Sequence, residues 1–580
     1  MPEPDIHPAT YNAPMTKTRT DAGPLQQMLS AAVSGLRNSG TRMRNNLARL
    51  LPGKRPGWVV LNLRGSYPAR KEKRRLWSAD TLMGKKAELS QEELDALVSA
   101  MLKADWLKGV VVRLEEPGFG LAAAYAIRRQ LARLKESGRR VVFTANHLGL
   151  ATYYLASVAD EVIMPESAEL TVAGLAISNT YRADFLGRFG LRVQKLAIRE
   201  YKSSMDDLAR SSMSDGNREQ LNAILDSFQQ TFARDVAASR GVQPLDVSRW
   251  IDEGVSSAAQ ARALGMIDRV AYEDEFLTKK HKPLPAARRF LMRPLRPVSQ
   301  GRVAFVSLDG AIIPGKSRQF PVPLPLIGGK MAGSETLVRA LRAAGRNRAT
   351  RAVVFHVESG GGSALASDLI WREVKLLADR MPVVAVMGAV AGSGGYYVLT
   401  HATKVLASPV TITGSIGVLT MKFVMDEFNS RYGFNHEVIK RGRFADLSDS
   451  SRPWDDAEEA QVGRYIDEIY GRFVTRVAEG RKLDPVRVNE IGRGRIWSGE
   501  DALEIGLIDE IGDVSSAIGL ARQLAGLHEN APVWTVETPQ QYVLPVGTDA
   551  DAVQRAVMPL LRERALLVTP HGGLQQITRI

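Results

Sequence analysis

The chain has 580 residues, 44% apolar and 24% charged, a composition that is typical of a globular protein and excludes a fully disordered or fibrous chain. It contains no cysteine, which excludes disulfides, a thiolate nucleophile and cysteine-ligated metal sites. The formal charge of +14 is concentrated in two segments: residues 1–75 carry a net +10 and residues 279–302 a net +8, so the remainder carries −4. Such segments are either solvated without a ligand or attracted to an anionic surface. Because a nucleic-acid binder is expected to carry its basic excess on folded faces, we expect a membrane surface and no nucleic acid.

The amino-terminal segment, residues 1–57, is predicted to be a basic arm. Its beginning is polar and Pro-rich, without the apolar core of a signal peptide, so we expect the protein on the cytoplasmic side. Within the arm, apolar residues of 25–51 recur at helical spacing beside several arginines. This pattern predicts an amphipathic helix that either makes peripheral membrane contact or packs on its own protein.

An internal repeat organises the rest of the chain. The run GLATYYLASVADEV (149–162) aligns with GSGGYYVLTHATKV (392–405) at an offset of 243 residues, and the same offset aligns residues 109–120 with 352–363. We therefore predict two diverged copies of one unit. The predicted segments are the arm 1–57, a first copy 58–278, a basic Pro-rich linker 279–301, a second copy 302–530 and a tail 531–580.

Each copy alternates short apolar strand-like runs with helix-like runs, which predicts an α/β fold with parallel βαβ units. In the second copy the predicted strands are 303–308, 352–357, 382–387 and 404–409, and the predicted helices are 334–344 and 363–380. The uncharged stretch 381–403 is long enough to span a bilayer. However, it contains several glycines and changes midway from a strand-like to a helix-like pattern, so no transmembrane span is predicted.

The two copies differ where chemistry is expected. Ser393 lies in the run GSGGYY between a predicted strand and a predicted helix, where flanking glycines leave its hydroxyl unobstructed. The first copy has Leu150 at this place, so packing does not require a serine. The amide of Gly394 would be a free donor at a helix start, as an oxyanion hole requires. The structural alternative is a small-residue helix packed tightly against the sheet.

A serine nucleophile needs a base. The eight histidines form no recognisable constellation with an acid. The 243-residue offset instead matches Lys202 with Ala445, so one copy has a lysine without the serine and the other a serine without the lysine. A surface lysine is the alternative for Lys202 alone, but complementary loss in a duplicated chain favours a shared Ser–Lys site.

Two further turns accompany Ser393. The run SGGGS (359–363) follows a predicted strand and can expose a second oxyanion amide, whereas the lysine and spacing of a phosphate-binding loop are absent. The run TGSIGV (413–418) is by itself compatible with a plain turn and a capping serine.

With these residues the chain resembles the signal peptide peptidase A family, serine–lysine endopeptidases of the long, duplicated type within the Clp-protease/crotonase-like superfamily. The resemblance implies two tandem ββα-spiral domains, Ser393 as nucleophile, Lys202 in a Tyr-Lys-Ser run as base, and Ser415 as a serine that helps hold the lysine. It also implies oxyanion amides at Gly361 and Gly394 and substrate contacts from Gly362, Gly395 and Tyr396. The turn departs from the family at Gly360, where proline is usual.

The function implied is cleavage of signal-peptide remnants or other membrane-associated or unfolded polypeptides through an acyl-enzyme, without metal or cofactor. A ring-like homotetramer with an internal cavity is also implied. The alternatives are a crotonase-like acyl-CoA enzyme, which would use the same fold without the Ser–Lys pair, and a non-catalytic scaffold with a decayed site.

Overall fold

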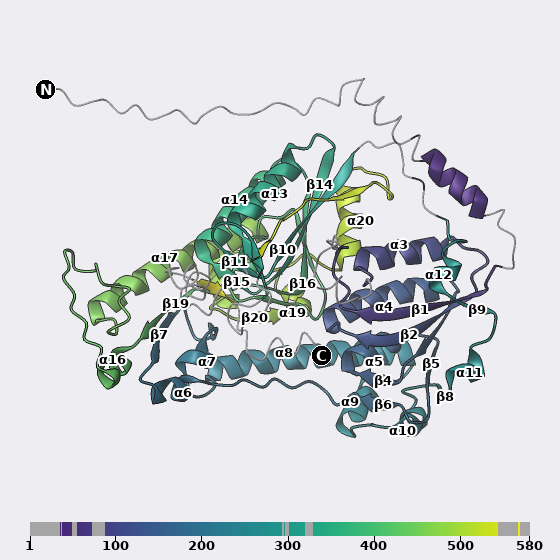
Figure 1. Cartoon of the computed structure of the whole chain (residues 1–580), viewed down its shortest axis with the longest axis horizontal. Coiled ribbons are helices and arrows are strands. Elements are labelled where there is room, and N and C mark those ends of the chain that lie inside the picture. Colours follow the sequence, from purple (N-terminus) through teal and green to yellow (C-terminus); the bar gives the residue numbers. More distant parts are fainter. Residues whose placement is uncertain are drawn as a thin grey trace.

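A computed structural model describes residues 35, 38–48, 55–71, 88–292, 295, 301–319, 329–542 and 566–568. The described residues form two α/β units side by side, the first coloured purple to blue and teal and the second teal through green to yellow (Figure 1). Each unit is built on its own parallel sheet, and a third sheet joins strands of both units.

The first unit contains a six-stranded sheet in which every strand pair is parallel. Its central strands are nearly continuous apolar runs because helices cover both faces of the sheet. In sheet order the strands are β8 (Arg269–Val270), β5 (Glu161–Met164), β3 (Arg140–Thr144), β2 (Gly109–Pro117), β1 (Trp58–Gly65) and β9 (His281–Pro283). A separate parallel pair is formed by β4 (His147–Gly149) and β6 (Glu169–Thr171).

The second unit repeats this sheet and adds two strands to it. The repeated strands are β21 (Glu510–Ile511), β17 (Lys404–Ala407), β16 (Val383–Gly392), β14 (Thr350–Ser359), β10 (Arg302–Asp309) and β22 (Val533–Thr535). The added strands are β18 (Ile412–Gly414), parallel to β16, and β20 (Ile496–Ser498), antiparallel to β18. The predicted duplication and the α/β class of the fold are therefore confirmed.

The duplication extends further than the aligned motifs indicated. Residues 281–283, which lie in the predicted linker, form β9 and close the first sheet against β1. Residues 533–535, in the predicted tail, form β22 and close the second sheet against β10 in the same way. The linker and the tail therefore each contribute an edge strand to the copy that precedes them.

The third sheet brings the two copies together. Its order is β23 (Gln541–Tyr542), β12 (Arg318–Gln319), β13 (Lys330–Gly333), β11 (Ala311–Ile313), β15 (Gly361–Ser363), β24 (Leu566–Val568), β19 (Leu419–Val424) and β7 (Arg192–Ala197). The pair β19–β7 is antiparallel and links the second copy to the first along six residues of each strand.

Helices cover the sheets in corresponding places of the two copies. Those of the first are α3 (Gln91–Leu102), α4 (Leu121–Glu136), α5 (Leu150–Ala156), α6 (Ala183–Arg188), α7 (Asp206–Ala209), α8 (Asp215–Arg240), α9 (Pro244–Asp252), α10 (Ala258–Ala263), α11 (Glu273–Phe276) and α12 (Leu284–Ala287). Those of the second are α13 (Ser334–Arg346), α14 (Ala364–Ala378), α15 (Gly394–Tyr397), α16 (Asp426–Tyr432), α17 (Asp456–Arg481), α18 (Pro485–Ile491), α19 (Gly499–Glu504) and α20 (Val514–Leu524). The long helix α8 reaches from the first copy to the second, where Ser227 donates a 2.8 Å hydrogen bond to Ser498 (Figure 1).

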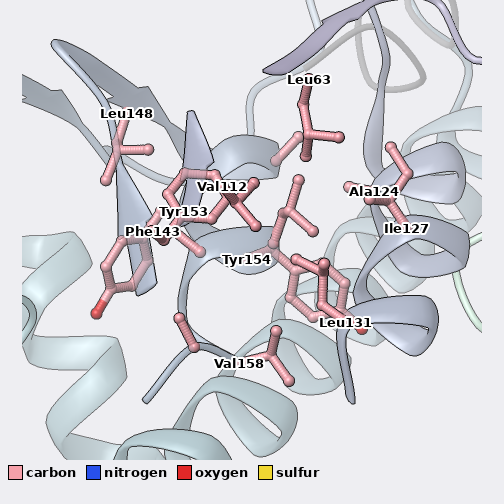
Figure 2. Packing of buried hydrophobic residues seen from close by; sticks show 14 of the residues in the cluster. Leu63, Val112, Ala124, Ile127, Leu131, Phe143, Leu148, Tyr153, Tyr154 and Val158 are labelled. Carbon is pink, nitrogen blue, oxygen red and sulfur yellow. The ribbon is translucent and has the colours of Figure 1, made fainter. Parts of the chain in front are cut away.

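The core of the first copy forms around α5. Figure 2 shows Tyr153 and Tyr154 of this helix packed near Val112 and Phe143 of the sheet. Leu150, the counterpart of Ser393, is only 3% exposed and belongs to the same apolar cluster. The place that holds a serine in the second copy is therefore ordinary core in the first.

The uncharged stretch 381–403 is the strand β16 followed by α15, in agreement with the prediction that it does not span a membrane. In the part of the chain that the structure describes, no helix is both long and apolar enough to cross a bilayer. Of the predicted helix at 25–51, only residue 35 and residues 38–48 are described, and they are helical. Arg44 in this helix donates to the carbonyl oxygens of Arg288 and Leu291, so the helix contacts its own protein.

Candidate active site

The antiparallel ladder between β7 and β19 brings the two predicted half-sites together. It pairs Ala197 with Leu419, and the chain continues the contact with a 2.8 Å hydrogen bond from the Ile198 N–H to the Val418 carbonyl. Lys202 follows β7 by a few residues, and Ser415 precedes β19 by a few residues. The ladder therefore fixes the lysine of the first copy beside the serine turns of the second.

Ser393 stands at the junction of β16 and α15 in a strained backbone conformation. Its φ of 53° and ψ of −116° are unusual for a residue with a side chain, and its hydroxyl does not cap the helix. The Ser393 N–H donates to the Gly414 carbonyl at 2.8 Å, which ties this junction to the turn that carries Ser415. Ser415 also has a positive φ, of 52°. Both turns therefore direct a serine side chain inward at the cost of backbone strain.

Lys202 reaches both serines. Its Nζ lies 2.7 Å from the Ser393 Oγ, 2.9 Å from the Ser415 Oγ and 3.0 Å from the Ser415 carbonyl oxygen. Lys202 is 2% exposed and both serines are fully buried. The structure thus assembles the predicted Ser393, Lys202 and Ser415 into one solvent-excluded cluster.

Burial lowers the pKa of Lys202 well below its ordinary value, because a charged ammonium loses its hydration there. The positive charge of Lys195 lowers the pKa of Lys202 further. Among the described side chains, no carboxylate forms an ion pair with the Lys202 amine. A neutral amine with an available lone pair is therefore favoured, as a general base requires.

Residues of both copies contact the segment around Lys202 and fix its position. Gln220 of α8 is fully buried; it donates to the Tyr201 carbonyl at 3.1 Å and accepts from the Ile496 N–H at 3.1 Å. Gly494, with a φ of +88°, lies so close that an added Cβ would come within 2.7 Å of the Lys202 Cα. Sequence reasoning missed these positioning residues, because neither belongs to a motif and both act through contacts between the copies.

The predicted oxyanion donors differ in their surroundings. The Gly394 N–H is in the first turn of α15, where no intrahelical acceptor exists. The Gly361 N–H, by contrast, donates to the Ser359 Oγ at 3.1 Å, and Ser359 in turn donates to the Gly310 carbonyl at 2.7 Å. Gly394 and Gly361 are nevertheless adjacent, since a Cβ added to Gly394 would lie 3.2 Å from the Gly361 Cα.

Comparison with known proteins shows the family to which the chain belongs. The model of Peptidase family S49 matches residues 133–286 and 375–528, once in each copy. The chain belongs to this family. The serine protease SPPA of Arabidopsis thaliana chloroplasts is 31% identical over 478 residues, which cover 79% of this chain and 70% of that protein. Protease 4 of Haemophilus influenzae and Protease 4 of Salmonella typhi are each 26% identical to this chain. The aligned regions cover 82% and 83% of this chain, respectively, and 80% of each relative.

The chain is thus a serine peptidase of family S49 with two tandem α/β domains, as the resemblance implied. A solved structure of a ClpP1 mutant from Listeria monocytogenes covers 37% of this chain and 94% of that chain at 14% identity, with a TM-score of 0.23. The family match and the strand order of the two copies carry the fold assignment.

In this S49 peptidase, the residues predicted to bind substrate have different surroundings. Gly362 lies in β15, where its backbone is paired with β11 and β24. Gly395 packs against the neighbouring turn, since an added Cβ would lie 2.4 Å from the Ser359 carbonyl oxygen. The Tyr396 side chain is fully buried and donates to the Leu507 carbonyl at 2.8 Å. Its counterpart Tyr153 does the same with Met266 in the copy without the serine, which indicates a packing role for the ring.

A partly buried carboxyl beside the site was not predicted. Strand β16 bulges opposite β14 just before Ser393, and Glu358 accepts hydrogen bonds there from Ala389 N–H at 2.7 Å and Val390 N–H at 3.3 Å. Burial raises the pKa of Glu358 to about 7. The residue directly precedes the SGGGS turn, so it joins the two chain segments that carry Ser393 and Gly361. A bulge leaves no signal in the sequence, and its position is apparent only from the register.

Proposed function

We propose that this S49 peptidase cleaves peptide bonds with Ser393 as nucleophile and Lys202 as general base. The observation that carries the proposal is the 2.7 Å contact between Lys202 Nζ and Ser393 Oγ inside a buried cluster. Neutral Lys202 takes the hydroxyl proton while Ser393 Oγ attacks the substrate carbonyl carbon. The resulting ammonium then donates the proton to the leaving amine, and an acyl-enzyme remains on Ser393.

Ser415 keeps the lysine amine directed at Ser393 through contacts to its hydroxyl and carbonyl oxygens. The Gly394 N–H stabilises the tetrahedral oxyanion, because it is an unpaired first-turn donor next to the nucleophile. Gly361 serves as the second donor when its N–H turns from Ser359 toward the oxyanion. Deacylation follows when neutral Lys202 activates a water molecule.

We further propose that the substrates are signal-peptide remnants and other unfolded or membrane-associated chains, met at the cytoplasmic side. Support comes from the basic arm, whose described helix leaves Met43 and Leu47 at 66% and 55% exposure beside the exposed Arg42. Liposome pelleting of the chain with and without residues 1–57 tests this contact: the full chain should pellet with anionic vesicles and the shortened chain should not.

Self-association into a tetramer completes the proposal. Exposed aromatic side chains gather where α6 of the first copy meets α16 of the second: Phe185, Phe189, Tyr432 and Phe434 are 43–58% exposed. Apolar surface of this kind marks an interaction site. Sedimentation velocity of the full chain should give a tetramer, and Phe434→Glu should shift it toward smaller species.

The catalytic proposal is tested by fluorophosphonate labelling and casein cleavage with wild type, Ser393→Ala and Lys202→Met. Both variants should lose at least about 1,000-fold in cleavage, and Ser393→Ala should lose labelling. Ser408→Ala changes a buried serine elsewhere in the second copy and should retain activity. Cleavage that persists in both site variants would refute the dyad.

A further inference from the structure

The third sheet contains a strand that comes from the far end of the chain. Strand β24, Leu566–Val568, lies between β15 and β19 and is antiparallel to both. It is the element that connects β15 to β19 in the strand order of this sheet. Without it, the facing edges of β15 and β19 would be separated by one strand position, about 10 Å across.

This strand position is beside the candidate active site. The ladder pairs Val568 with Gly361 and Leu567 with Gly362. Gly361 is in van der Waals reach of Gly394, the residue that follows Ser393. On the other side, Leu566 is paired with Leu419 in β19, the strand that follows the Ser415 turn. The backbone of β24 therefore runs directly past the serine and both oxyanion glycines.

The contacts of β24 are those of a bound peptide. Two unpaired strand edges bind an extended chain by strand addition, with backbone hydrogen bonds for affinity and side-chain pockets for specificity. Leu566 supplies such a side chain: it is 5% exposed and packs with Leu419, Ala197 and Met205. The pocket is thus formed by both copies, next to the segment that carries Lys202.

We propose that residues Leu566–Val568 occupy the substrate cleft of their own chain and compete with peptide substrates for it. The inference rests on the proposed function, because only that function makes the cleft a substrate cleft. Occupancy of the cleft by this strand concerns binding alone and can be measured without turnover. If the strand fills the cleft nine-tenths of the time, the free cleft amounts to one tenth and the apparent affinity for an added peptide falls about tenfold. The buried Leu566 side chain also indicates that the cleft accepts an aliphatic residue at this position.

The test measures binding in full-length chains that carry Ser393→Ala, so that it does not depend on turnover. The probe is a fluorescein-labelled peptide with the sequence of residues 562–572, followed by fluorescence anisotropy. Leu567→Pro is added to release the strand, because proline lacks the N–H that a central strand needs. Leu566→Asp releases it independently by placing a charge in the apolar pocket. Gln575→Pro is the matched control, since it introduces a proline outside β24 in the same carboxy-terminal segment.

Both releasing variants should bind the peptide about tenfold more tightly than the Ser393→Ala chain, and the Gln575→Pro control should not differ from that chain. Equal affinity in all four chains, with unchanged thermal unfolding, would overturn the proposal. In the background with Ser393 intact, Leu567→Pro should lower KM about tenfold with little change in kcat. If no chain cleaves casein but the anisotropy difference remains, the proposed peptidase activity fails while the occupied cleft stands.

Discussion

The Nζ of Lys195 donates a 2.8 Å hydrogen bond to the carbonyl oxygen of Lys202 and is also paired with Asp206. One buried lysine therefore holds the backbone of another and places a positive charge near it. This charge lowers the pKa of Lys202, in the same direction as burial does. Lys195 thus contributes to the neutral state of the proposed base without contacting Ser393.

We predict that Lys195→Gln shifts the acid limb of the kcat/KM pH profile to higher pH. Removal of the positive charge makes protonation of Lys202 easier and leaves Asp206 without its partner, and both changes raise the pKa of Lys202. Activity should fall at neutral pH and recover in alkaline buffer. Lys195→Arg keeps the charge and should keep the limb near its original position. A loss of the same size at every pH would show that Lys195 acts only as a structural support.

Lys202→Met should abolish cleavage and stabilise the folded chain. In the unfolded chain lysine is protonated below its ordinary pKa of about 10.4, whereas in the folded chain the lowered pKa keeps Lys202 neutral. The unfolded state therefore binds more protons, and wild-type stability falls as pH decreases from about 10 toward the folded pKa. The free energy of unfolding of wild type, compared with that of Lys202→Met, should therefore fall by about 1.4 kcal/mol for each pH unit of this decrease.

The measurement is urea unfolding of both proteins at pH 7 and pH 9.5. The free energy of unfolding of the variant should exceed that of wild type by more at pH 7 than at pH 9.5. A difference that does not change with pH would contradict a neutral Lys202 in the folded chain.

The sequence alone predicted which residues would meet, because duplication supplied an internal comparison. Leu150 opposite Ser393 and Ala445 opposite Lys202 showed which side chains packing did not require. The apolar runs likewise predicted the parallel sheets, and the family match confirms the fold class. These features depend on local pattern and on a repeat, both of which are visible without coordinates.

Other features depend on register and on long-range pairing. The Gly361 N–H donates to the Ser359 Oγ because of the local turn geometry. Glu358 accepts a hydrogen bond from the Ala389 N–H because β16 bulges opposite it. Strand β24 is three residues long, and its partners are about 150 and 200 residues earlier in the chain. Short strands such as β9 and β24 have too little periodicity to be predicted, so their places in the first and third sheets are apparent only from the structure.

Ser415→Ala should lower kcat about fivefold and leave KM nearly unchanged. The variant loses the 2.9 Å contact to the Lys202 amine but keeps the 3.0 Å contact to the Ser415 carbonyl, so the lysine is less well directed but still held. A neutral hydrogen bond contributes about 1 kcal/mol, which corresponds to about a fivefold change in rate. Steady-state kinetics on a fluorogenic peptide give both constants, with Ser408→Ala as control. A rise in KM with kcat intact would assign Ser415 to substrate binding instead.

Glu358→Gln should remove part of the pH dependence of stability. Burial raises the pKa of Glu358 to about 7, so the folded chain holds this proton in the range where the unfolded chain has released it. Its contribution to stability is present below the unfolded pKa of about 4.3 and is lost as pH rises through 7. Wild type should therefore lose stability relative to Glu358→Gln between pH 5 and pH 8, by up to about 3 kcal/mol.

Urea unfolding of both proteins at pH 5, 6.5 and 8 measures this difference. Glu115→Gln provides the matched control, because Glu115 is the counterpart of Glu358 in the first copy and its partner is the Asn62 side chain, not a bulged strand. A Glu358→Gln chain that loses stability with pH as steeply as wild type would show that Glu358 does not titrate in this range.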